Sequence, residues 1–113
     1  MNLQHIFNHD AEKALGRELA ERLGKQLPPQ LISKRSQILS ANKISRLLEQ
    51  VFDIAKDYDV KNGLSFVRRA ILANSFKWEL DAKGYPKEFI DLATEGLIVE
   101  LAKARTTAKN HAV

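Results

Sequence analysis

Apolar residues between positions 44 and 58 recur with the spacing of an α-helix. The stripe consists of Ile44, Leu47, Leu48, Val51, Phe52, Ala55 and Tyr58. This period places the seven side chains on one face of a helix, which other parts of the chain must cover. We expect Ser40 to cap the helix, because Leu39 and Ile44 flank it with the spacing of a hydrophobic staple. The helix is expected to end near Asp59, before Asn62-Gly63.

Two further helices are expected before this one. Asp10 is expected to cap a helix that runs to about Leu23, with Gly24 supplying the left-handed stop. Pro28 and Pro29 then break the chain, and a short helix is expected from Gln30 to Gln37.

A third long helix is expected over about 64–83, closed by Gly84, and a fourth over about 87–106. Apolar residues spread around most of the third helix, so we expect it to be central. On the fourth, Ala93 and Gly96 are small enough for a neighbouring helix to approach closely. Glu100 falls on the same stripe, where an unpaired buried charge is costly, so it either pairs with Arg68 or Arg69 or lies at the edge of a wider stripe. A polar contact at a subunit interface is a further alternative.

These patterns predict an all-α fold, a compact bundle of four main helices with one or two short helical segments. Only three prolines and five glycines interrupt the 113 residues, which favours long helices over a β architecture. The length matches one domain over 1–113, with 1–9 and 107–113 expected to be frayed.

Several functional classes have no support in the sequence. Cysteine is absent, which excludes thiolate metal sites and thiol catalysis and fits a reducing, cytoplasmic compartment. No apolar run approaches the ~20 residues that cross a bilayer. We find no phosphate-binding loop, dinucleotide motif or serine elbow, so no enzyme activity, catalytic residue or cofactor is expected. His5 and His9 are spaced like helical metal ligands but are interpreted as surface histidines, with no metal.

The positive charge is concentrated in one segment. The chain has a net charge of +4, yet residues 22–46 carry six basic residues and no acidic one, leaving −2 for the rest. Such a segment attracts phosphate backbones or acidic protein surfaces. Short polar side chains lie among these cations and suit contacts to phosphates and base edges. The candidate binding residues are Arg22, Lys25, Gln30, Ser33, Lys34, Arg35, Gln37, Lys43 and Arg46.

The stretch Arg17-Glu-Leu-Ala-Glu-Arg-Leu-Gly24 resembles the first helix and turn glycine of helix-turn-helix DNA-binding domains. The resemblance implies that the following helix enters the major groove, with Gln30, Ser33, Lys34 and Gln37 facing DNA. Leu27-Pro28-Pro29 makes the turn longer than in that family.

The leading hypothesis is a non-enzymatic regulatory or accessory protein that binds nucleic acid through 22–46. One alternative is a protein-interaction module (inhibitor, adaptor or small chaperone) that docks on an acidic partner, and another is a self-associating bundle such as a homodimer. The charges can also be plain solvated surface. Trp78, Phe76 and Tyr85 are expected in the core and its rim, whereas an exposed Trp78 would indicate a protein-binding hot spot.

Overall fold

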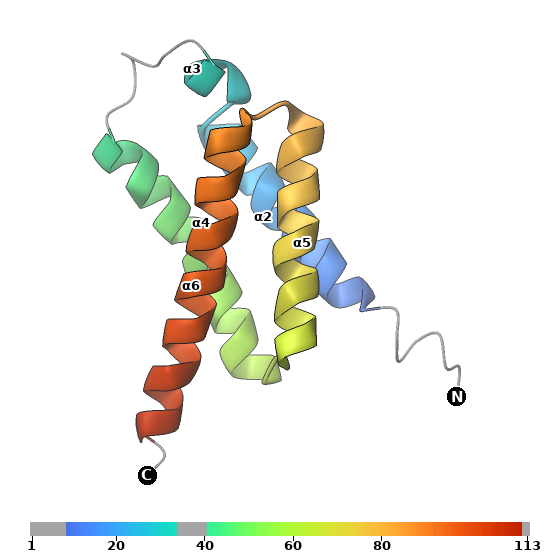
Figure 1. Ribbon diagram of the computed structural model, residues 1–113, viewed down its shortest axis with the longest axis vertical. Coiled ribbons are helices and arrows are strands. Elements are labelled where there is room, and N and C mark those ends of the chain that lie inside the picture. The colour runs from blue at the N-terminus through green and yellow to red at the C-terminus, as the bar shows by residue number, and fades with distance from the viewer. Residues whose placement is uncertain (1–8, 34–40, 112–113) are drawn as a thin grey trace.

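The computed structural model describes residues 9–33 and 41–111, with side chains for 9–32 and 42–103. All regular structure in these ranges is helical. The elements are α2 (Asp10–Gln26), α3 (Pro29–Ser33), α4 (Ala41–Asn62), α5 (Phe66–Lys83) and α6 (Lys87–His111) (Figure 1). The all-α bundle of four long helices with a short additional one, expected from the sequence, is therefore confirmed.

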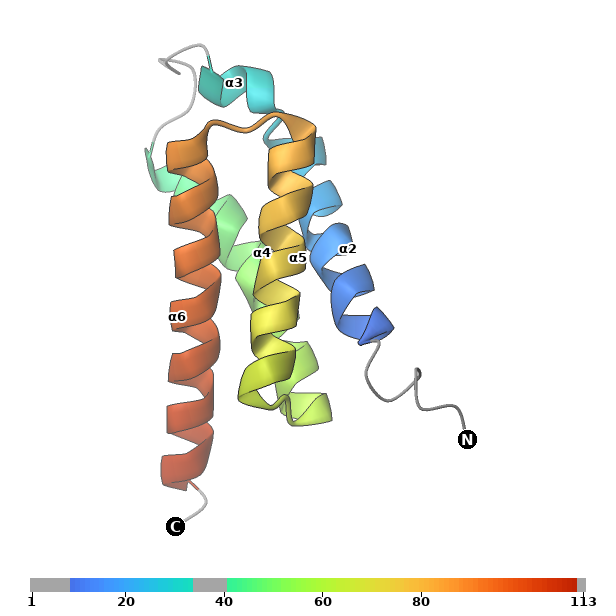
Figure 2. The ribbon, with the colours of Figure 1, turned by 45° about the vertical axis from the view of Figure 1, so that its right-hand side comes forward.

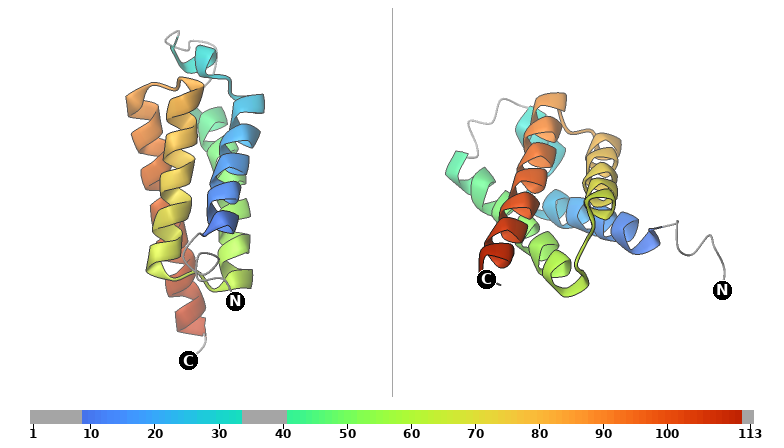
Figure 3. Two further views of the ribbon diagram at one scale, coloured as in Figure 1. Left: turned by 90° about the vertical axis from the view of Figure 1, so that its right-hand side faces the viewer. Right: turned by 60° about the horizontal axis from the view of Figure 1, so that its bottom comes forward.

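The helices form two layers. α5 and α6 make an antiparallel hairpin in the front layer, and α4 crosses behind it (Figure 2). α2 packs against α5 and α4, while α6 packs against α5 and α4 (Figure 3). The core between the layers is aliphatic with a few aromatic rings, and its fully buried members include Leu19, Leu23, Leu27, Leu64, Leu72, Phe76, Leu80, Leu97 and Leu101.

The expected stop at Gly24 is wrong. Positive φ angles among the glycines occur at Gly63 (57°) and Gly84 (92°), and α2 continues through Gly24 to Gln26. Leu27 is the C-cap residue that follows the helix, and its N–H donates to the Leu23 carbonyl at 2.8 Å. Pro28 explains this end, because a residue before proline is disfavoured in the helical region.

The other helix ends agree with the sequence to within a few residues. α5 begins at Phe66, where the Ser65 hydroxyl caps the helix by accepting from the Arg68 N–H at 3.2 Å, and Gly84 closes it as expected. Asp10 was expected to be the N-cap of the first helix, but it is the first residue of α2, and His9 occupies the N-cap position without a side-chain capping hydrogen bond. Leu39 and Ser40 lie outside the described residues. α4 extends to Asn62 and α6 to His111, beyond the expected ends.

Two glycines set the distance between helices. A Cβ added to Gly96 would lie 2.9 Å from Phe52 Cζ, and one added to Gly16 would lie 2.6 Å from Ser75 Cβ. The prediction that Gly96 allows a close approach is confirmed, with α4 as the neighbour. Gly16 does the same for α2 and α5, and the sequence did not reveal that contact.

Two buried carboxylates hold the corner where α4 turns into α5. Glu12, which is 2% exposed, accepts from Tyr58 Oη at 2.7 Å and from Arg68 Nε at 2.9 Å. Asp59 accepts from the Leu64 N–H at 2.9 Å and from Arg69 Nε at 3.0 Å. Each carboxylate is therefore compensated by a guanidinium, as buried charges require.

The expected pairing of Glu100 with Arg68 or Arg69 is wrong. Glu100 lies 3.5 Å from Lys56 Nζ of α4 and 3.6 Å from Lys103 Nζ, while the two arginines serve Glu12 and Asp59. The reason is geometric, since the side of α6 that carries Gly96 and Glu100 faces α4 and not α5.

The aromatic cluster at the upper end of α5 divides in two. Phe76 and Tyr85 are buried, as expected of core residues, and the Tyr85 ring stacks on Phe89. Trp78 is 64% exposed. It therefore belongs to the outer surface of α5 and not to the core.

Candidate binding groove

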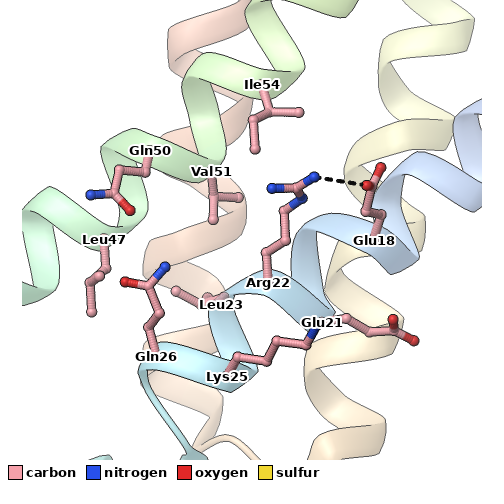
Figure 4. A pocket seen from close by; sticks show the side chains of 10 residues that line it. All are labelled: Glu18, Glu21, Arg22, Leu23, Lys25, Gln26, Leu47, Gln50, Val51 and Ile54. Atoms are coloured by element: carbon pink, nitrogen blue, oxygen red, sulfur yellow. Dashed lines mark hydrogen bonds and ion pairs between the residues drawn. The ribbon is translucent and has the colours of Figure 1, made fainter.

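A groove of about 520 Å³ lies between α2 and α4 (Figure 4). Leu23 of α2 and Leu47 and Val51 of α4 lie at its base but are each less than 10% exposed, and Ile54 is half-buried at the edge. The groove opens away from α5 and α6, whose ribbons lie behind it in Figure 4. A volume of several hundred Å³ is typical of a binding site.

Polar side chains form the walls of the groove. Arg22 extends from α2 toward α4, and its Nη2 donates to Glu18 Oε1 at 3.1 Å (Figure 4). Gln26 and Gln50 reach in from the two helices near Leu47. The amide groups can donate and accept hydrogen bonds, so they suit the backbone or side chains of a bound peptide.

Of the predicted binding residues with described side chains, Arg22 and Lys25 line this groove. Lys43 and Arg46 do not line it. Both are exposed, and they precede Leu47 and Gln50 respectively by four residues, so they lie about one turn before the groove on α4. The basic segment thus lines the α2 wall and lies near the α4 wall.

The remaining predicted residues are not placed in the groove. Gln30 is exposed on α3, and Ser33 ends that helix. Lys34, Arg35 and Gln37 lie outside the described residues. Gly24, the turn glycine of the helix-turn-helix resemblance, is inside α2, so the chain turns only at Leu27 and Pro28.

Two features of the groove were missed by sequence reasoning. The apolar stripe predicted for the helix now seen as α4 lies in the core as expected, but Ile54 beside it is only half-buried and lies at the edge of the groove. In addition, Glu18 and Glu21 add two carboxylates to the α2 wall. The signal for the first was Ile54, an apolar residue at the edge of the stripe beside Gln50. The positions of Glu18 and Glu21, one turn before the basic residues Arg22 and Lys25, were visible as well.

Charges of both signs lie along the α2 wall of the groove. Arg22 and Glu18 lie toward Ile54, whereas Lys25 and Glu21 lie further along α2 (Figure 4). A bound segment would therefore meet a cation and a carboxylate at both positions.

The described residues contain no group of three or more histidine or acidic side chains arranged to hold a metal. Of the predicted histidine pair, His5 lies outside the described residues, and His9 Nδ1 lies 3.5 Å from Glu12 Oε1. No helix in the described part of the chain is long and apolar enough to cross a membrane.

Comparison of the chain with models of protein families, with curated proteins and with solved structures found no match.

Proposed function

We propose that this protein is a non-enzymatic interaction module that binds an amphipathic, acidic segment of a partner protein in the α2–α4 groove. The groove carries the proposal, because the half-buried Ile54 lies at its edge and the exposed cations Arg22 and Lys25 line it. A helix laid in such a groove would contact Ile54 with its apolar side chains and Arg22 and Lys25 with its acidic side chains.

The groove fits a protein segment better than a nucleic acid backbone. Phosphates gain nothing from the apolar edge at Ile54, and Glu18 and Glu21 repel them. The lining residues include no aromatic ring on which a base could stack. Glu18 and Glu21 repel the carboxylates of a peptide as well, so the lack of an aromatic ring and the apolar edge at Ile54 are the features that favour a peptide.

Nucleic-acid binding is the second candidate. It is favoured by the exposure of Lys25, Lys43 and Arg46, three cations of the basic segment 22–46. In this case the backbone would contact these cations and leave Ile54 unused. The cytoplasmic location expected from the sequence also stays a prediction.

A fluorescence-anisotropy titration separates the two candidates. The probes are a labelled helical peptide with leucine at helical spacing and glutamate between, and a labelled DNA duplex. Ile54→Glu puts a charge at the edge of the groove and should weaken peptide binding about tenfold, the effect of losing roughly one buried aliphatic contact. Lys43→Glu/Arg46→Glu should weaken it further, whereas Lys77→Glu, an exposed lysine on α5, is the matched control and should have no effect.

The result that overturns the proposal is equally specific. If the duplex binds with a log–log salt slope near −3, as about three phosphate contacts imply, and Ile54→Glu leaves that binding unchanged, the protein binds nucleic acid. If neither probe binds, the groove is not the binding site.

A further inference from the structure

The outer surface of the α5–α6 hairpin is apolar. Six large apolar side chains on these two helices are about half exposed or more: Phe66, Val67 and Trp78 on α5, and Leu92, Ile98 and Val99 on α6. Ile71, partly exposed, falls between Val67 and Trp78 at spacings of four and seven residues, so the three form one stripe along α5. Leu92 and Val99 are seven residues apart and likewise share a side of α6.

The two stripes lie side by side. α5 and α6 are antiparallel and joined at Gly84–Pro86, so residues equally distant from the turn lie at the same level (Figures 1 and 2). Trp78 is thus level with Leu92, and Ile71 with Val99. The buried residues of both helices face the opposite way, toward α2 and α4. A row of exposed apolar side chains therefore runs along the outside of the hairpin, and we call it the hairpin face.

Charge is distributed unevenly along this face. Near the turn, residues 77–95 contain five acidic residues (Glu79, Asp81, Glu88, Asp91 and Glu95) and three lysines (Lys77, Lys83 and Lys87). Past Glu100 the sign changes, since Lys103 is 67% exposed and residues 101–113 contain no acidic residue. α6 also continues past the α4–α5 turn, where no other described helix covers it (Figures 1 and 3).

We propose that the hairpin face binds a second copy of this chain, with the two α6 helices antiparallel and Val99 near the two-fold axis. A two-fold interface must be complementary to itself. A face with an acidic end, an apolar centre and a basic end meets this requirement when one copy is inverted. This register places Glu95 of each copy opposite Lys103 of the other and lays each α6 extension along the acidic half of its neighbour.

The size of the face limits the affinity. Two helices of about 18 residues are roughly 27 Å long, and side by side they are about 20 Å wide, so each copy offers on the order of 500 Å². This lies at the low end for specific interfaces. We therefore expect a reversible dimer that dissociates in the micromolar range.

Sedimentation equilibrium from about 5 to 500 µM tests the dimer, since the mass should rise from 12.8 kDa toward twice that value. Val99→Glu places two like charges at the axis and should keep the protein monomeric. Val60→Glu is the control, because Val60 is 72% exposed on α4, outside the hairpin face, and the dimer should persist. Circular dichroism confirms that both variants are folded.

Charge reversal tests the orientation. Lys103→Glu should weaken the dimer about tenfold by facing acidic residues with an acidic one, and the exchange Glu95→Lys/Lys103→Glu should restore it. Trp78 is the chain's single tryptophan, so its emission should shift to the blue with the same concentration dependence as the mass. A monomer at 500 µM, or a dimer that Val99→Glu leaves intact, overturns the proposal. A dimer that the double exchange fails to restore overturns the antiparallel register.

Discussion

Replacing Gly16 by alanine tests the close packing of α2 on α5. The added Cβ would lie 2.6 Å from Ser75 Cβ and Oγ and 2.8 Å from the backbone nitrogen of Phe76. Carbon atoms in contact are normally about 3.5–4.0 Å apart, so the helices must separate by roughly 1 Å or distort. A rotation of Ser75 would relieve only part of the clash, since the Phe76 nitrogen moves only with the α5 backbone.

The change in unfolding free energy is the sum of one stabilising and two destabilising effects. Alanine favours the helix over glycine by about 1 kcal/mol. Overpacking costs about 1–3 kcal/mol, and the Ser75 hydroxyl, which donates to the Lys13 carbonyl at 2.7 Å, would lose about 1 kcal/mol if displaced. The free energy of unfolding should therefore fall by about 2 kcal/mol, which corresponds to a Tm lower by roughly 8 °C.

Gly24→Ala is the matched control, in the same helix. Its Cβ would meet nothing closer than Lys83 Cδ at 3.6 Å, at the end of a flexible side chain, and its φ is not positive. Stability should therefore rise by about 0.5 kcal/mol. Urea unfolding of both variants, with Gly16→Ala/Ser75→Gly as partial rescue, completes the test. If Gly16→Ala proves as stable as Gly24→Ala, α2 and α5 are not as closely packed as the structure indicates.

Four further measurements address the buried polar groups. Glu12→Gln should lower the free energy of unfolding by about 2 kcal/mol in urea melts, because an NH2 group, which cannot accept, would replace one of the two oxygens that accept from Tyr58 and Arg68. The hydrogen bond from Arg68 lowers the pKa of Glu12 from 4.5 despite its burial. The ionised Glu12 should therefore stabilise the fold above pH 4.5, and this contribution should be lost as the pH falls through the lowered pKa. Glu12→Gln should flatten that part of a curve of unfolding free energy against pH. Burial raises the pKa of Tyr85 to about 12, so the free energy of unfolding, followed by circular dichroism, should fall from about pH 10 to 12. In Tyr85→Phe this fall should be smaller. That variant also loses the hydrogen bond to the Leu27 carbonyl and should be about 1 kcal/mol less stable at neutral pH. Thr94→Val should stabilise by up to about 1 kcal/mol in thermal melts, because the buried Thr94 hydroxyl has no hydrogen-bond partner among the described residues; a lower Tm would show that it has one.

Local sequence signals were sufficient for the helices themselves. The stripe from Ile44 to Tyr58 and the glycine at position 84 predicted α4 and the end of α5, because each depends on residues within a few turns. Gly24 shows where such signals compete. A glycine near a helix end predicts a stop, yet Pro28 acts on Leu27 directly, and this steric restriction determined the end of α2.

Long-range contacts were harder to anticipate. Glu12 pairs with Arg68 across 56 positions, and only its place in register with Leu15, Leu19 and Leu23 marked it as a buried charge. Glu100 carried the same signal, but the sequence did not show which helix would face it. The groove could not be predicted either, because it depends on how α2 and α4 cross.

The two proposed surfaces lie on opposite sides of the molecule. The α2–α4 groove opens away from α5 and α6, whereas the hairpin face is their outer side (Figures 2 and 4). A dimer would therefore carry two accessible grooves. A partner with two acidic segments would then bind the dimer more tightly than one segment does, because the second contact forms at a high effective concentration. Val99→Glu should abolish this gain while leaving the affinity for a single peptide unchanged, whereas Ile54→Glu should weaken both. If Val99→Glu weakens the single-peptide affinity as well, the two surfaces are not independent.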